Sequence, residues 1–92
     1  MSAITVKFFG YFREITGVTL INLTGSYTTV GDVLNAVVEK YPEIRDKIFE
    51  GKKLVPFIKV LLNGLAVEVL NGLDTPVKTG DALAIFPPVG GG

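Results

Sequence analysis

The chain has 92 residues, a length that predicts a single domain. Hydrophobic residues make up 48% of it, which predicts a folded and not a disordered segment. Nine Lys and Arg residues balance nine Asp and Glu residues, which excludes a basic surface for nucleic acid and a polybasic membrane anchor. Because there is no cysteine, disulfides, thiol catalysis and cysteine metal sites are excluded. No apolar run approaches the ~20 residues of a transmembrane helix. We therefore expect a soluble, cytoplasmic protein without a metal.

The first segment predicts a β-hairpin. Residues 3–9 alternate, with Ile4, Val6 and Phe8 on one face, which is typical of a strand with one buried side. Residues 18–24 form a second strand in this interpretation, and residues 10–17 between them are predicted as a loop or a single turn. So short a connection favours antiparallel pairing.

A long amphipathic helix follows the hairpin. Apolar residues recur from Val30 to Tyr41 at the spacing of one helical face. Thr29 is predicted as the N-cap, with Asp32 in the position of a capping-box acid. Pro42 ends the helix and starts a short second helical turn.

The second half of the chain predicts three further strands. Asn63-Gly64 is the strongest hairpin signal in the sequence and indicates a type I′ turn. The predicted segments are, in order, a turn at 51–53, a strand at 57–62, a strand at 65–70, a loop at 71–77, a turn at 78–81 and a strand at 82–86.

This order of elements predicts an α+β fold of the β-grasp (ubiquitin-like) type. We expect a five-stranded mixed sheet with one long helix packed on one face, together with the short second helical turn. The first and last strands would lie side by side at the centre of the sheet. Residues 1–86 would form the domain and residues 87–92 a flexible C-terminal Gly-Gly tail.

The tail is the most informative stretch of the sequence. Pro87 and Pro88 end the strand, because proline lacks a backbone donor, and the three glycines after Val89 can enter a slot too narrow for other residues. We therefore interpret the terminal carboxylate of Gly92 as the reactive group of the protein. The alternative is that the glycines are idle, because glycine-rich ends are commonly unstructured. The rigid Pro-Pro spacer and the glycine at the last position favour a functional tail.

A surface for partners is predicted on the sheet face opposite the helix. The strand registers place four large apolar side chains there, and patches of this kind mark binding sites. The alternative is that the second helical turn or residues 49–56 fold back and cover some of them. The predicted partner-binding residues are Phe9, Phe57, Leu61, Phe86, Pro87, Pro88, Val89 and Gly90.

Several stretches of this chain resemble one known family, the ubiquitin-like sulfur carriers related to the small subunit of molybdopterin synthase. The similar segments cover nearly the whole length in the same order, and the tail together with the Phe-Arg-Glu turn is the most specific part. Residues 49–56 are a gap in the resemblance. The segments are 7–17, 29–34, 41–43, 73–81 and 84–92.

The resemblance implies a function for the tail. A ubiquitin-activating-type enzyme would use ATP to adenylate Gly92, and a sulfur donor would then displace AMP and leave a C-terminal thiocarboxylate. The large subunit of molybdopterin synthase would bind the tail and use its sulfur to build the dithiolene of molybdopterin. Gly91 and Gly92 would correspond to the family's glycine pair. The chain would bind no cofactor itself, and the catalytic groups would belong to the large subunit, so that this chain is a subunit without catalysis of its own.

Other functions start from the same adenylate. One is a ubiquitin-like modifier joined to lysines of other proteins through Gly92. Another is a sulfur carrier for thiamine or for tRNA thiolation. A plain binding domain with an idle tail is the remaining alternative.

Overall fold

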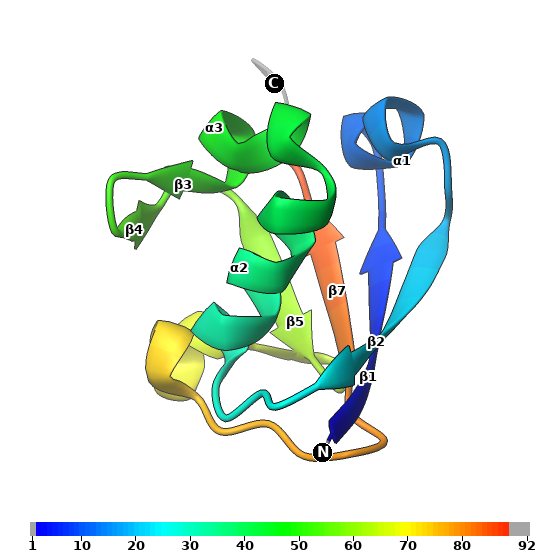
Figure 1. Ribbon diagram of the computed structural model, residues 1–92. Coiled ribbons are helices and arrows are strands. Elements are labelled where there is room, and N and C mark those ends of the chain that lie inside the picture. The colour runs from blue at the N-terminus through cyan, green and yellow to red at the C-terminus, as the bar shows by residue number, and fades with distance from the viewer. Residues whose placement is uncertain (1, 89–92) are drawn as a thin grey trace.

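The computed structural model describes residues 2–88 (Figure 1). The sequence predictions for Val89, Gly90, Gly91 and Gly92 therefore lie outside the described residues. In the described part, no helix is long and apolar enough to cross a bilayer.

The centre of the fold is a five-stranded mixed sheet, as the sequence predicted. The strands lie in the order β2-β1-β7-β5-β6, with β1 and β7 parallel and the other neighbours antiparallel. The first and last strands are thus side by side in the middle of the sheet, which confirms the β-grasp prediction. The strands are β1 (Ser2–Phe8), β2 (Leu20–Gly25), β5 (Lys59–Leu62), β6 (Leu65–Ala66) and β7 (Ala82–Phe86).

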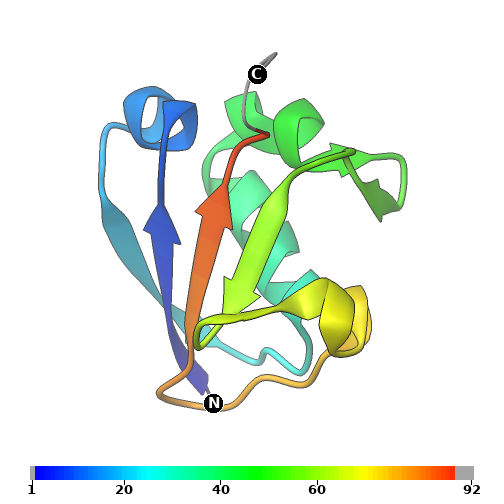
Figure 2. The same ribbon diagram turned by 180° about the vertical axis from the view of Figure 1, so that it is seen from behind.

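Helix α2 (Val30–Lys40) covers one face of this sheet, and the opposite face is open (Figures 1 and 2). Its N-terminus has the predicted capping box: the Thr29 hydroxyl accepts from the Asp32 N–H at 3.2 Å, and the Asp32 carboxylate accepts from the Thr29 N–H at 3.1 Å. The apolar stripe of α2 packs on alternate residues of β1, β5 and β7, so the core is the layer between helix and sheet.

The short second helical turn is also confirmed. A 3₁₀ turn, η1 (Pro42–Ile44), leads into α3 (Arg45–Ile48), and both Ile44 and Ile48 are fully buried. The next segment, for which the sequence predicted a turn at 51–53, is a small hairpin. Its strands are β3 (Phe49–Glu50) and β4 (Lys53–Leu54).

The prediction of a loop or single turn at 10–17 is wrong in its detail, because the segment contains a six-residue helix, α1 (Tyr11–Thr16). The Phe12 side chain is fully buried. Gly17 ends the helix in the left-handed conformation, with its N–H donating to the Arg13 carbonyl at 2.9 Å. Burial of Phe12 explains the helix, since so short a segment is not stable by itself.

The strand predicted at 65–70 is mostly wrong. The chain pairs only at β6 and then turns through η2 (Val67–Val69) and η3 (Gly72–Asp74). In a strand, Val67 and Val69 would lie on the same face. Here Val67 is buried whereas Val69 is 72% exposed, so the two valines lie on different faces. The Asn63-Gly64 turn before β6 is confirmed, because both residues have positive φ (50° and 86°) as type I′ requires.

Candidate functional site

The predicted exit of the tail lies at the end of β7, between two other strands. Strand β7 pairs with β1 on one side and with β5 on the other, and its last residue is Phe86. Figure 2 shows this strand end from the open side of the sheet. Pro87 and Pro88 follow it and are both half-buried.

Three contacts hold this strand end to the residues that follow β1. The Phe9 and Phe86 rings are stacked, with centroids 4.1 Å apart and planes 12° from parallel, and the Phe9 N–H donates to the Ile85 carbonyl at 3.2 Å. Pro87 packs so closely over Gly10 that a Cβ at position 10 would lie 2.5 Å from the proline Cγ. Gly10 also has a φ of 58°, so a glycine suits both the backbone and the contact.

Leu61 belongs to the same surface as Phe9 and Phe86. It is half-buried and pairs with Ala84 across β5 and β7, while Lys59 pairs with Phe86. Leu61 is therefore the diagonal neighbour of Phe86 on one face. We call Phe9, Leu61, Ala84 and Phe86 the open-face patch.

Phe57 is the predicted patch residue that the structure places differently. It lies before β5 and outside any strand, with a φ of 66°, which is unusual for a bulky residue, and 83% of its surface is exposed. Because the start of β5 lies beside the end of β7, Phe57 is at the same edge of the sheet as the tail exit. The structure thus brings Phe9, Leu61 and Phe86 onto one face and leaves Phe57 at its rim.

The sequence interpretation missed two members of this surface. Ala84 and Leu20 lie in one row across the sheet, because Lys7 is the partner of Leu20 in β2 and of Ala84 in β7. Leu20 is 43% exposed. The alternation of residues 18–24 could have indicated Leu20 as an exposed apolar residue. Ala84 is too small to be recognised as part of a patch of large apolar side chains.

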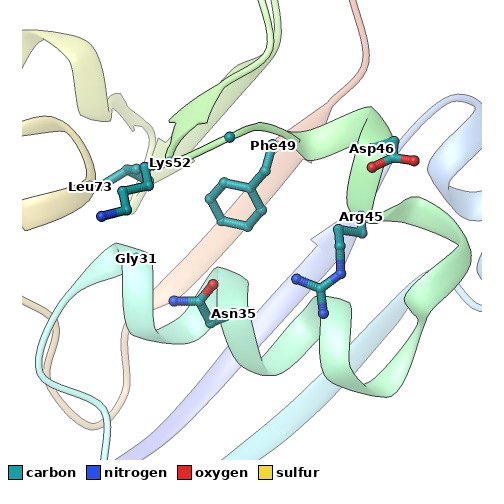
Figure 3. A pocket seen from close by; sticks show the side chains of 8 residues that line it. Gly31, Asn35, Arg45, Asp46, Phe49, Lys52 and Leu73 are labelled. Atoms are coloured by element: carbon teal, nitrogen blue, oxygen red, sulfur yellow. The ribbon is translucent and has the colours of Figure 1, made fainter.

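The predicted alternative, in which residues 49–56 cover the open face, is not what the structure shows. The β3–β4 hairpin instead lines a pocket with α2 on the helix side of the molecule (Figure 3). The second helical turn contributes Arg45 and Asp46 to the same pocket. The open-face patch is therefore free of both segments.

Charged groups near the patch are exposed or paired. Lys59 forms an ion pair with Glu68 at 2.8 Å, and both side chains are more than half exposed. Lys7 is exposed beside Ala84. Within residues 2–88 no three His, Cys, Asp or Glu side chains come together as a possible metal site.

One carboxylate supports the base of β7. Asp81 is 4% exposed and accepts hydrogen bonds from the Asn63 amide at 3.0 Å, the Lys78 N–H at 2.8 Å and the Lys78 ammonium at 3.1 Å. Burial raises the pKa of Asp81, but these hydrogen bonds and the Lys78 charge outweigh it and hold the pKa below its ordinary value. Asp81 thus satisfies a backbone donor of the turn that the sequence predicted at 78–81.

Comparison with protein families agrees with the fold. The profile of the ThiS family matches residues 6–92. Small archaeal modifier protein 3 of Haloferax volcanii is 38% identical over 88 residues, which cover 95% of this chain and 96% of that protein. The molybdopterin synthase sulfur carrier subunit of Haemophilus influenzae is 33% identical over 89 residues, covering 97% and 99%.

A solved structure shows the same architecture. The solution structure of small archaeal modifier protein 1 from Methanosarcina acetivorans superposes with a TM-score of 0.88 at 36% sequence identity. The match covers 100% of this chain and 98% of that protein. The overall fold described above is therefore shared with a small archaeal modifier protein.

Proposed function

The chain belongs to the ThiS family of ubiquitin-like sulfur carriers and modifiers, and from this premise we propose that the carboxylate of Gly92 is its reactive group. Gly91 and Gly90 have no side chain, so the backbone next to this carboxylate can enter a narrow enzyme slot. Pro87, Pro88 and Val89 form the spacer between the glycines and the domain.

The proposed reaction has two steps, both carried out with partner enzymes. In the first, the Gly92 carboxylate attacks the α-phosphorus of ATP in a ubiquitin-activating-type enzyme, and pyrophosphate leaves. In the second, a donor at the sulfide level, such as hydrosulfide, attacks the carbonyl carbon of the adenylate and AMP leaves, which yields the thiocarboxylate. Activation is needed because a carboxylate oxygen is a poor leaving group, whereas the thiocarboxylate sulfur is a ready nucleophile.

The position of β7 carries this proposal. The strand that precedes the tail pairs on both sides, and Phe86 and Pro87 are held by Phe9 and Gly10. The point where the tail leaves the domain is therefore held rigidly. A partner needs such a fixed point if it is to receive the end of the chain in a defined direction. The open-face patch and Phe57 surround this fixed point and would bind the partner.

The role that we propose first is that of sulfur carrier and small subunit of a molybdopterin synthase. It is supported by the relative in H. influenzae that bears this name, which matches this chain along nearly its whole length. The large subunit would supply the catalytic groups and transfer the sulfur to the dithiolene of molybdopterin.

A second role has support of equal weight. A relative at 38% identity is a small archaeal modifier protein, which favours conjugation of Gly92 to lysines of other proteins. A sulfur carrier for thiamine or tRNA thiolation uses the same adenylate. These roles differ in what attacks the activated carbonyl, namely a lysine amine or a sulfur donor.

The mass of the C-terminal peptide tests the proposal. Protein isolated from its native source should contain a fraction in which one oxygen of the Gly92 carboxylate is replaced by sulfur, and this fraction should disappear when the activating enzyme is deleted. Tryptic peptides in which a lysine of another protein carries residues 79–92 of this chain, joined through Gly92, would instead support the modifier role, because Lys78 is the last tryptic site before the tail. If neither species is found and the purified chain accepts no AMP from an activating enzyme, Gly92 is not the reactive group.

A further inference from the structure

The β3–β4 hairpin and α3 form a pocket that the proposed function does not use. It has a volume of about 390 Å³ and lies between α2, α3, the hairpin and η3. The elements that line it lie on the helix side of the sheet (Figure 1), and Figure 3 shows the pocket from close by, so it is separate from the open-face patch. The lining residues are Gly31, Asn35, Arg45, Asp46, Phe49, Gly51, Lys52 and Leu73.

Two cations and one aromatic ring define the chemistry of this pocket. Figure 3 shows the Phe49 ring between the Arg45 and Lys52 side chains, with the Arg45 guanidinium directed toward Asn35 on α2. The ion pairs within residues 2–88 are Lys59–Glu68 and Lys78–Asp81, so Arg45 and Lys52 have no ion-pair partner in that part of the chain. Asp46 also lines the pocket, and the net charge of the lining is one positive charge (two cations and one carboxylate).

The second cation comes from the segment that the sequence left unexplained. Lys52 is at the turn of the hairpin, and the Val55 N–H donates to the Ile48 carbonyl at 2.9 Å, which ties the end of the hairpin to α3. The hairpin thus carries Lys52 and Phe49 to α2. This placement gives residues 49–54 a role beyond that of a connection.

We propose that this pocket binds an acidic segment of a partner protein. A guanidinium pairs with a carboxylate in a bidentate geometry, and an ammonium pairs with a second carboxylate as a compact point charge. The Phe49 ring and Leu73 offer apolar surface for the methylene groups of glutamate side chains. A volume of this size holds one or two side chains, which fits a short segment and not a folded surface.

A titration of ¹⁵N-labelled protein with an acetylated and amidated hexapeptide of glutamate and leucine tests this proposal. The peptide should shift the amide signals of Gly31, Asn35, Phe49 and Gly51, and it should leave those of Phe9 and Ala84 in place. The same peptide with glutamine in place of glutamate should bind at least about tenfold more weakly, as expected for the loss of charge-assisted pairs.

Two double variants of equal charge make the test specific. Arg45→Gln/Lys52→Gln should weaken binding of the glutamate peptide about tenfold or more, whereas Lys7→Gln/Lys40→Gln, with both lysines exposed and outside the pocket, should stay within about twofold. An equal loss in both variants would show that the peptide responds to net charge alone and would overturn the proposal. Saturable binding of inorganic phosphate at the same amides, without binding of the peptide, would also overturn it.

The result does not depend on the chemistry of the tail. Peptide binding is measured without ATP or activating enzyme and involves no reaction of Gly92, so a protein that fails the terminal-mass test can still bind the peptide. Conversely, an active sulfur carrier without peptide binding would leave the proposed function in place and remove this site.

Discussion

At the scale of single residues, Asp81 shows how the fold uses a buried charge. Its carboxylate accepts three hydrogen bonds, and Asn63 joins it to the β5–β6 turn. Asn63 in turn accepts from the Ala82 N–H at 2.9 Å. One carboxylate thereby fixes the start of the central strand β7 to a turn 18 residues away.

We expect Asp81→Asn to lower the free energy of unfolding by about 1–3 kcal/mol, because the amide turns one acceptor into a donor that faces other donors. Asp74→Asn, at an exposed carboxylate, is the control and should change little. Urea denaturation of both variants at neutral pH measures the effect. Equal losses would show that Asp81 is not special.

The pH dependence follows from the lowered pKa of Asp81. Because the folded pKa lies below the unfolded value of about 3.9, the ionised form stabilises the fold at pH values above that value, and the contribution is lost as the pH falls through the folded pKa. The difference in stability between wild type and Asp81→Asn should therefore be largest near neutral pH and shrink below about pH 4. Thermal melts from pH 7 to pH 2 measure it, and a difference that grows in acid would contradict this account.

Phe57 is the opposite case, a large apolar residue in a conformation that costs energy and with most of its surface in water. A positive φ for such a residue costs on the order of 1–3 kcal/mol, and burial does not compensate for it here. This combination is typical of an interface anchor.

We expect Phe57→Asn to leave the free energy of unfolding within about 0.5 kcal/mol or to raise it, since asparagine tolerates positive φ. Binding of the activating enzyme or of a large synthase subunit should weaken by about 2 kcal/mol, roughly 30-fold, as for a hot-spot residue. Isothermal titration measures the affinity. Val69→Asn, at another highly exposed apolar residue that is remote from the tail exit, should bind normally, and a loss of binding there would argue against a specific patch.

At the scale of elements, helix α2 is the one whose boundaries follow most directly from local chemistry. The N-cap, the capping box and the apolar stripe are all encoded within residues 29–41. Helix α1 and the 3₁₀ turns η2 and η3 differ, because each has six residues or fewer. Segments this short show less than two turns of periodicity, so burial of Phe12 decides the conformation of α1 and burial of Val67 that of η2, whereas η3 buries no side chain.

The capping box allows a test at this scale. Thr29→Ala removes the oxygen that accepts from the Asp32 N–H, and we expect a loss of about 1 kcal/mol in the free energy of unfolding. Thr28→Ala is the matched control, because the backbone N–H of Thr28 that donates to Asp32 is retained. Chemical denaturation compares the two, and equal stability of both variants would mean that the box contributes nothing.

At the scale of the whole molecule, the buried core lies in the part of the chain that precedes the tail. Every residue of the buried core that the structure describes lies between Ile4 and Ile85. The proposed reactive group, Gly92, follows the core in sequence. In the proposed function, the fold would supply the rigid base of the tail and the partner surface, and the partners would supply the catalytic groups.

Deletion of Gly91 and Gly92 should separate stability from function. We expect the melting temperature to stay unchanged, because the described core contains neither residue, and formation of the adenylate with an activating enzyme to be abolished. Circular dichroism and release of pyrophosphate measure the two properties. A truncated chain that is still adenylated would contradict the proposed role of Gly92.

The sequence by itself determined the β-grasp order, the capped helix, the type I′ turn and the candidate tail, because alternation, helical spacing and turn chemistry are local properties of neighbouring residues. It also placed Phe9, Leu61 and Phe86 on one face, since a strand register follows from a period of two. The tertiary structure decided where Phe57 leaves the strand, which short segments become helical, and that Arg45, Lys52 and Asn35 meet at one pocket. Those features depend on contacts between segments far apart in the chain, and no local period encodes them.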